Sequence, residues 1–453
     1  MSRTGSAQSR VDAGARAIAA CESTINALIT DCVDDARDVA ALADRAQAAG
    51  HDGGLLAGVT MLIKDNINTA GLRTTSGSRF FSDFVPNQDA PVVARLRAAG
   101  AIIMGKSTLH EFAFGIRSNN SVSGQCLNPW DLARVPGGSS GGSGASVAAN
   151  YCVGALGSDT GGSVRLPAAF CGISGLRPTV GRVTNAGSMP VCPSQDTIGP
   201  MARSVLDVAK MLAVIAEPDS GPGMQTAQPL GNFLPTLEAG VEGVRIGIPR
   251  NMYFDDVEAS IGACIEASMK QLEQLGAQLV PVDVPDADSM HQWATIVIFS
   301  DACELHAERL RNQPGEFDDQ VRERMLTGQS FTGVDYARAM RARERWRETL
   351  ADVFSRVDVM LSPAVHTQVP PVADDKSLLE ATKAATRNTY AGAFGQIPGL
   401  SIPCGFSTDG LPVGLQLEAK WWNEPTLLRV GRAFQRESDW HLRVAPHGGP
   451  LLT

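Results

Sequence analysis

The chain has 453 residues, of which 43% are hydrophobic and 19% charged, and its formal net charge is −9. This composition is typical of a globular protein with a large core. The acidic balance disfavours a nucleic-acid-binding protein, which would present a basic face. No apolar run in the sequence approaches the roughly 20 residues that span a bilayer. We therefore expect a cytoplasmic protein with no membrane partner.

Two amphipathic helices are predicted within residues 10–50, where Ile18, Ile25, Leu28 and Ile29 recur at helical spacing. The next elements are predicted as a strand at Gly58–Lys64, a helix at 92–99, a strand at Ala101–Met104 and a helix at Ser143–Asn150. The small residues of the last helix suit close packing on a sheet.

A passage rich in proline and glycine, residues 215–240, separates these elements from the second half of the chain. The later elements are predicted as a strand at Val244–Pro249, a helix near 258–275, charged helices within 300–356, and strands at Val357–Pro363 and Leu400–Phe406. Strands and helices that alternate in this way predict an α/β fold. The sequence contains no linker that would divide the chain into independent domains.

The cysteines and histidines give no sign of a metal or disulfide framework. Nine cysteines, an odd number, are scattered along the chain and form no C-x-x-C pair. His110 and Glu111 lack the second histidine of a zinc-protease helix. We therefore expect reduced thiols, no metal and no cofactor.

Residues Gly100–Ser107 match the P-loop pattern letter for letter. In a P-loop, the residues between the two glycines form a turn that wraps a phosphate. Here those residues are Ala-Ile-Ile-Met, which instead predict a buried strand. The match is therefore interpreted as accidental, and nucleotide binding is rejected.

Two overlapping G-x-S-x-G patterns surround Ser139 and Ser140. The nucleophile elbow with this pattern requires a strand directly before it and a histidine later in the chain. Pro136 and the loop composition around it argue against such a strand, and the downstream histidines lie in uninformative surroundings. A Ser-His-Asp hydrolase stays open as the weaker alternative.

Two glycine-serine segments, residues 136–144 and 157–167, carry the most specific signal. Glycines allow backbone N–H groups to converge on a ligand, and serines supply nucleophiles, so the pair is typical of an acyl-transfer site. Lys64 ends an apolar strand and is the candidate base, because burial lowers the pKa of a lysine. Pairing with Asp65 or exposure to solvent explains Lys64 equally well from local sequence.

A long ordered series of motifs extends these segments. It comprises Gly58–Asp65, Thr74–Ser78, Gly100–Phe112, Asn128–Trp130, Pro136–Ala149, Leu156–Arg165, Pro167–Gly172, Gly175–Arg182, Asp196–Pro200, Gly399–Phe406 and Gly410–Gln416. On these motifs the chain resembles the amidase signature family, the Ser–cis-Ser–Lys amidohydrolases. The resemblance covers most of residues 20–440. It implies one large α/β domain with a central mixed β-sheet flanked by helices.

The resemblance also implies a role for each matching residue. Ser163 is expected to be the nucleophile, Ser139 the bridging serine and Lys64 the base, with a cis peptide bond between Gly138 and Ser139. The backbone N–H groups expected to form the oxyanion hole belong to Thr160, Gly161, Gly162 and Ser163. The residues expected to support the loops are Ser140, Asp159 and Arg165.

Candidate substrate-binding residues follow Glu111 in the chain. By family position or apolar character they are Ala113, Phe114, Gly115, Ile116, Met189 and Val191. Because these residues are mostly apolar and Arg117 is the one charge beside the first group, we expect a neutral amide or carbamate. Ile296 and Phe299 are interpreted as core.

The expected organisation is a pair of N-terminal helices at 1–54 packed on a family domain at 55–445, with a variable, partly helical lobe at about 215–345 near the site. The expected function is hydrolysis of a C–N bond in a small amide, urea or carbamate through an acyl-enzyme. The expected partners are that small molecule and no nucleic acid, and a homodimer would be ordinary for the family. The alternatives are the glutamine-hydrolysing subunit of a tRNA-dependent amidotransferase and a non-catalytic relative.

Overall fold

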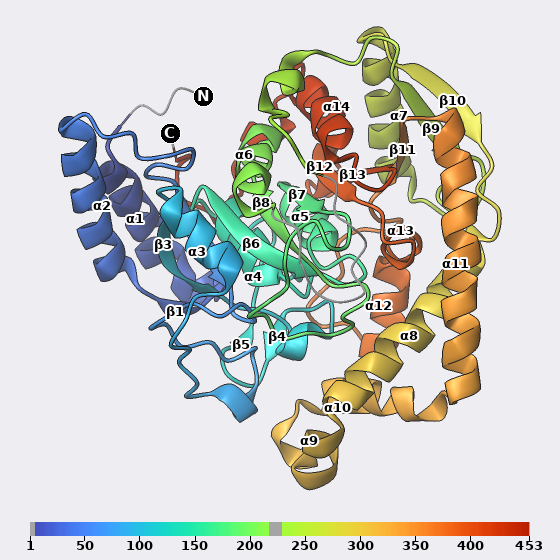
Figure 1. Ribbon diagram of the computed structural model, residues 1–453, viewed down its shortest axis with the longest axis horizontal. Coiled ribbons are helices and arrows are strands. Elements are labelled where there is room, and N and C mark those ends of the chain that lie inside the picture. Colours follow the sequence, from blue (N-terminus) through green and yellow to red (C-terminus); the bar gives the residue numbers. More distant parts are fainter. Residues whose placement is uncertain (1–4, 217–228, 453) are drawn as a thin grey trace.

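The computed structural model describes residues 5–216 and 229–452. Within these residues, eleven strands form one mixed sheet that runs through the molecule, and helices cover both of its faces (Figure 1). From one edge to the other, the strands are Leu28–Asp31 (β1), Ile102–Ser107 (β3), Thr60–Lys64 (β2), Gly154–Asp159 (β6), Thr197–Ala202 (β8), Ser174–Arg177 (β7), Gly399–Phe406 (β12), Pro412–Ala419 (β13), Val359–Pro363 (β11), Arg245–Pro249 (β9) and Gln278–Val282 (β10). The predicted single α/β domain with a central mixed sheet is confirmed.

Parallel and antiparallel pairs are segregated along the sheet. Strands β3, β2 and β6 are parallel, and so are β11, β9 and β10. The strands between these two groups pair antiparallel. A separate short ribbon joins Asn119–Asn120 (β4) to Gly124–Gln125 (β5).

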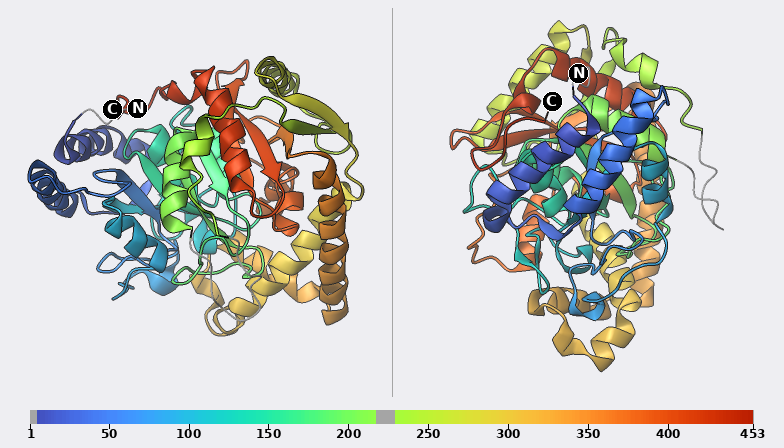
Figure 2. Two further views of the ribbon diagram at one scale, coloured as in Figure 1. Left: turned by 45° about the horizontal axis from the view of Figure 1, so that its top comes forward. Right: turned by 90° about the vertical axis from the view of Figure 1, so that its left-hand side faces the viewer.

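The helices form two layers around the sheet. They are Ala7–Ile25 (α1), Val33–Ala48 (α2), Pro91–Ala98 (α3), Gly141–Ala148 (α4), Arg165–Cys171 (α5), Val205–Ile215 (α6), Ala259–Gln274 (α7), Met290–Leu305 (α8), Ala307–Asn312 (α9), Asp319–Leu326 (α10), Gly333–Arg356 (α11), Leu378–Ala385 (α12), Tyr390–Phe394 (α13) and Glu424–Arg436 (α14). Helices α4 and α5 pack together on one face, whereas α6 and α14 lie side by side on the other (Figure 2). Helices α8, α10 and α11 form a lobe at one end.

The alternation of side chains along β2 decides where Lys64 points. Met61 and Ile63 pack in the hydrophobic cluster on the α6 and α14 side of the sheet. Leu62 packs in the cluster that contains α4, on the opposite side. Because strand side chains alternate with a period of two, Lys64 shares the face of Leu62. It therefore lies at the carboxyl end of β2, beside the turn that precedes α4.

Most predicted elements are present with shifts of a few residues at their ends. The strands predicted in the second half are β9, β11 and β12, and the charged helical region contains the end of α8, then α9, α10 and α11. The segment between α1 and α2 was expected to be helical, but it forms β1 and pairs antiparallel with β3. Leu28 and Ile29 are therefore buried in an edge strand. Residues 217–228 of the predicted proline- and glycine-rich passage lie outside the described residues.

The remaining predictions about the whole chain concern thiols and membranes. All nine cysteines are free thiols. No helix in the described ranges is both long and apolar enough to cross a bilayer.

The packing of the central strands makes a stability prediction. Leu156 lies on β6 and is fully buried, so Leu156→Ala removes packed methyl groups and leaves a cavity. We expect the free energy of unfolding to fall by about 2–5 kcal/mol. The control is Leu42→Ala on α2, where the side chain is 59% exposed and the expected change is within about 0.5 kcal/mol. Urea denaturation of both variants checks this, and equal losses would contradict it.

Candidate active site

Lys64 ends β2 with its side chain completely buried. Its Nζ lies 2.8 Å from Ser139 Oγ and 2.8 Å from Ser158 Oγ, and the amine donates a hydrogen bond to each hydroxyl. Burial lowers the pKa of Lys64 to about 7, against the opposing effect of the Asp159 and Asp196 charges. A substantial fraction of the amine is therefore neutral near pH 7, and a neutral amine can accept a proton.

The two glycine-serine turns are joined to each other beside Lys64. Ser139 is buried in the turn before α4, and the peptide bond between Gly138 and Ser139 is cis. Ser163 is partly exposed in the turn between β6 and α5. The backbone N–H of Ser140 donates to the Ser163 carbonyl at 3.3 Å, and Ser140 Oγ donates to the Ser158 carbonyl at 3.2 Å.

The carboxylate of Asp159 organises the turn that carries Ser163. It lies 3.1 Å from Arg165 Nε and 3.3 Å from Arg177 Nη1, and all three side chains are fully buried. It also accepts the backbone N–H groups of Gly162 at 2.7 Å and Val164 at 3.1 Å. Although burial alone would raise the pKa of Asp159, the two guanidinium groups hold it well below its usual range. The turn is thus built around a permanent buried anion.

These contacts correct one expectation about the oxyanion hole. The N–H of Gly162 donates to Asp159, so it is not available to an oxyanion in a bound substrate. The glycine itself is required, because its φ is +139° and a Cβ would lie 2.5 Å from Thr389 Oγ1. A Cβ on Gly161 would lie 2.2 Å from Tyr390 Cε1. The Tyr390 ring therefore packs directly on the turn that carries the predicted nucleophile.

A small cavity of about 30 Å³, here called the inner pocket, opens on Ser163. It is lined by Ala113, Phe114, Gly115, Ile116, Thr160, Gly161, Ser163, Val191, Ile298, Arg324, Thr382, Thr386 and Tyr390. Arg324 is the one charged residue among these lining residues. The space holds only a few atoms, so a substrate that reaches Ser163 extends beyond it.

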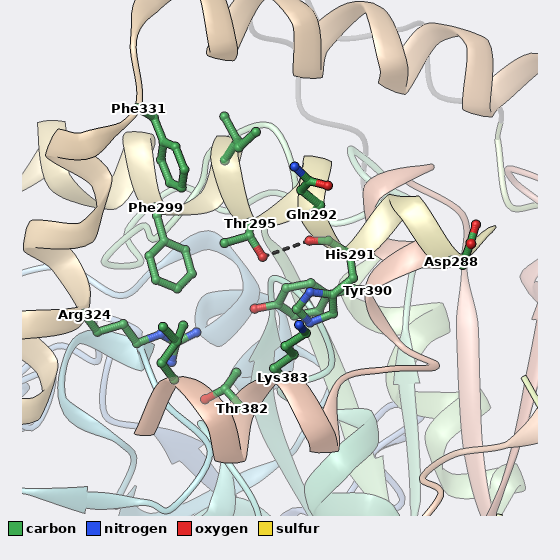
Figure 3. Close-up of a pocket in the computed structure, with 12 residues that line it drawn as sticks. Asp288, His291, Gln292, Thr295, Phe299, Arg324, Phe331, Thr382, Lys383 and Tyr390 are labelled. Atoms are coloured by element: carbon green, nitrogen blue, oxygen red, sulfur yellow. Dashed lines mark hydrogen bonds between the residues drawn. The ribbon is translucent and has the colours of Figure 1, made fainter. Parts of the chain in front are cut away.

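A larger cavity of about 440 Å³, here called the outer cavity, shares Arg324, Thr382 and Tyr390 with the inner pocket (Figure 3). Its other lining residues are Asp288, His291, Gln292, Thr295, Ile296, Phe299, Phe331, Leu379 and Lys383. Residues Ile296 and Phe299, which were interpreted as core, thus also border this cavity. The two cavities together form a continuous binding space beside Ser163.

Arg324 of α10 is held firmly between these cavities and is only 5% exposed. Its Nη1 donates to the Phe114 carbonyl at 3.0 Å, and its guanidinium carbon lies 4.3 Å from the Phe114 ring centroid and 4.9 Å from that of Phe299. A further hydrogen bond joins it to Tyr390. Its Nε has no hydrogen-bond partner within the described part of the chain. Burial lowers the pKa of Arg324.

The accidental P-loop match is explained by β3. Its apolar residues lie in that strand, which confirms the rejection of a phosphate-wrapping turn. Lys106, the lysine of the match, is buried 3.6 Å from the Asp65 carboxylate and donates to the Ile67 carbonyl at 2.6 Å. Asp65 is therefore paired with Lys106, and Lys64 is left to the serines.

The histidine alternative finds little support in the geometry. Ser139 Oγ is bonded to Lys64, and the histidine nearest in sequence to the pocket segment, His110, is buried beneath Gly115. Burial, with the charges of Arg324 and Arg117, lowers the pKa of His110 to about 3. In the described ranges no three His, Cys, Asp or Glu side chains are grouped as metal ligands.

The structure places the candidate substrate-binding residues as follows. Ala113, Phe114, Gly115, Ile116 and Val191 line the inner pocket, whereas Met189 does not.

Met189 is bonded instead through its backbone N–H to the Asn66 carbonyl at 2.8 Å. Arg117, the charge noted beside the pocket segment, lies 3.6 Å from Asp374 and donates to the Lys376 carbonyl at 2.6 Å. Its charge is therefore matched by an acid outside the pocket.

The sequence analysis missed four residues of this site: Ser158, Arg324, Thr386 and Tyr390. For Arg324 the available signal was helical spacing, since Val321 and Met325 are apolar and buried on the same side of α10. Thr386 and Tyr390 follow a stretch without a distinctive motif. Their place in the pocket results from the tertiary fold alone.

The family model described as Amidase matches residues 10–428. The chain belongs to this family, and it is an enzyme of the class that hydrolyses carbon–nitrogen bonds other than peptide bonds. Its sheet and flanking helices are those of the amidase signature fold.

Named relatives refine the comparison. A glutamyl-tRNA(Gln) amidotransferase subunit from Roseiflexus sp. (strain RS-1) is 37% identical over 453 residues, which cover 94% of this chain and 92% of the relative. The structure of the corresponding subunit from Thermotoga maritima is 30% identical, with a TM-score of 0.80 over 96% of this chain and 95% of the other. An s-triazine catabolic enzyme, described from a vestigial protein complex, is 32% identical with a TM-score of 0.89 over 96% of both chains.

These relatives contradict the expected partners. The chain was expected to bind a small molecule and no nucleic acid, with a homodimer as its assembly. The curated relatives are instead named as one subunit of an enzyme whose name includes a tRNA. The acidic composition that motivated the expectation describes one chain, and it gives no information about what the other subunits of an assembly bind.

The buried Asp159 cluster makes a second stability prediction. Asp159→Asn removes the anion that two buried arginines share, so we expect the free energy of unfolding to fall by about 3–5 kcal/mol. The control is Asp358→Asn, which breaks a half-exposed ion pair with Arg245 and should cost about 0–1 kcal/mol. Thermal and urea unfolding compare the two, and similar losses would show that the cluster contributes no more than a surface pair.

Proposed function

We propose that the chain is the amide-hydrolysing subunit of an amidotransferase-type complex that acts in a tRNA-dependent reaction. Its substrate is a small carboxamide that also carries a carboxylate, the class that includes glutamine, and its product is ammonia. The observation that carries this proposal is the inner pocket, which holds Ser163 and the buried guanidinium of Arg324 together. The names of the relatives support the subunit role.

In this proposal the chemistry is a serine acylation. Neutral Lys64 takes a proton from Ser139, which takes one from Ser163 while Ser163 Oγ attacks the amide carbonyl. The same path returns the proton to the departing nitrogen, which leaves as ammonia, and water then hydrolyses the acyl-enzyme. The 2.8 Å contact of Lys64 with Ser139 and the lowered pKa of Lys64 support this scheme.

The oxyanion is stabilised, in this scheme, by backbone N–H groups of the turn between β6 and α5. The donors are those of Thr160, Gly161 and Ser163, since the N–H of Gly162 is taken by Asp159. Donors fixed before the reaction stabilise developing charge without reorganisation, and one of them typically contributes about 10²–10³ in rate. Asp159 and Arg165 support the turn from behind.

Arg324 recognises the carboxylate of the substrate. A buried guanidinium without a carboxylate partner is costly, and a planar carboxylate matches its fork of N–H donors. Because Arg324 borders both cavities, the carboxylate binds there while the amide lies at Ser163. The expectation of a neutral substrate, which rested on the apolar wall alone, is thereby replaced.

A second candidate is a hydrolase of small-molecule catabolism. The similarity to the s-triazine catabolic enzyme, which is higher in TM-score than that to the amidotransferase subunit, favours it. The two candidates share the chemistry at Ser163 and differ in the fate of the ammonia.

The substrate class is tested by charge. Arg324→Met removes the cation and keeps the side-chain length, so we expect kcat/KM for carboxylate-bearing amides such as glutaramate and succinamate to fall about 10²-fold. Hydrolysis of the neutral counterpart butyramide should change only a few-fold. Ammonia release by the purified protein, with any chain that co-purifies, is the measurement. Equal effects on both kinds of amide would overturn the proposed class.

Two serine variants serve as controls in the same assay. Ser163→Ala should reduce turnover of every substrate to below about 10⁻⁴ of wild type, whereas Ser146→Ala, a buried serine on α4, should keep it. Full activity of Ser163→Ala would refute the mechanism. Co-purification of partner chains and tRNA supports the first candidate, and activity of the isolated chain on catabolic amides and ureas supports the second.

The lowered pKa of Lys64 predicts the pH dependence. The neutral amine is the base, so kcat/KM should rise with pH through about 7 and level off about one unit higher. Lys64→Arg keeps the positive charge but cannot be deprotonated, so it should be inactive at every pH. Initial rates with an uncharged amide, which does not titrate in this range, are the measurement. A rate that falls as pH increases through 7 would contradict the role of Lys64.

A further inference from the structure

The charges around the substrate space are unbalanced. Among the described residues that line the inner pocket, Arg324 is charged and none is acidic. The outer cavity adds Lys383 and one acid, Asp288. Asp288 and Arg324 lie at opposite ends of that cavity (Figure 3). The region around the guanidinium is therefore positive and has no counter-charge of its own.

The acids nearest to the pocket wall are occupied elsewhere. Asp196 accepts the hydroxyl of Thr160 at 2.5 Å and the backbone N–H groups of Val191 at 2.9 Å and Cys192 at 3.0 Å. It is not among the lining residues, and its contacts hold the wall from behind. These bonds leave it unable to turn toward a ligand without breaking the wall.

Glu111 is the second such acid, and it fixes Arg324 in place. Its Oε2 accepts the backbone N–H of Asp318 at 2.7 Å, and Asp318 is the N-cap residue of α10. Arg324 on the same helix donates to the carbonyl of Phe114, which lies close to Glu111 in the chain. The guanidinium is thus held at both ends of α10 and has little freedom to move away from a like charge.

We infer that the site selects a carboxylate-bearing amide without an adjacent ammonium group, such as the monoamide of a dicarboxylic acid, over an α-amino acid amide. The inference rests on the proposed function and concerns only the substrate of this site. In an α-amino acid the ammonium and the carboxylate share one carbon atom. Binding of the carboxylate at Arg324 therefore brings the ammonium beside a guanidinium, in a buried place without an acid to pair with it.

The matched pair of substrates is glutaramate and L-glutamine, which differ only in the α-ammonium group. We expect kcat/KM for ammonia release to be on the order of 10²-fold higher for glutaramate, because an unpaired buried charge is strongly disfavoured. Calorimetric binding of both compounds to Ser163→Ala gives the same comparison without turnover, and glutaramate should again bind more tightly.

A charge placed in the pocket should reverse the preference. Thr386 lines the inner pocket and is 3% exposed, so Thr386→Asp supplies a carboxylate there. Thr386→Asn has the same shape without the charge. We expect the Asp variant to raise the ratio of glutamine to glutaramate hydrolysis at least about tenfold, and the Asn variant to keep the wild-type ratio.

The outcomes separate this inference from the proposed function. If glutamine is hydrolysed and bound as well as glutaramate, or better, the inference is wrong and the carboxylate class stands. If butyramide exceeds both compounds, the proposed class is wrong and the inference falls with it. A preference for glutaramate that Thr386→Asp reverses and Thr386→Asn keeps supports both.

Discussion

The buried carboxylate of Asp159 is the interaction on which the rest of the site depends. It holds two arginines from neighbouring segments and two backbone N–H groups of one turn in a region without solvent. A buried anion of this kind is stable only when all its partners are in place. The turn that carries Ser163 therefore has a single geometry, and the residues that pack on it, such as Tyr390, inherit that geometry.

Lys64 owes its properties to a similar economy of charge. A lysine at the end of a central strand would ordinarily pair with the next acid in the chain. In this fold Lys106 of the neighbouring strand takes Asp65, and two serine hydroxyls surround the Lys64 amine. The lysine is consequently buried without a salt bridge, which is the condition that lowers its pKa.

How far the sequence predicts this molecule depends on the distance over which each feature is determined. The alternation of Met61, Leu62 and Ile63 and the glycines around Ser139 and Ser163 are local patterns, so the strands, the turns and their meeting could be anticipated. The edge strand β1 could not, because its short apolar run fits a helix equally well and only β3 decides between them. Arg324 looks like one more surface charge until the lobe folds over the sheet.

The walls of the inner pocket come from chain segments that do not carry the nucleophile. The serines and the lysine lie on the sheet and its turns, whereas Ile298, Arg324 and Thr386 come from α8, α10 and the end of α12. Mutations in these helices can alter what is recognised while the reacting groups stay untouched. Such a division of labour gives a lineage freedom to acquire new nutrients or new assemblies through drift in one lobe, on a chemical engine that never has to be rebuilt.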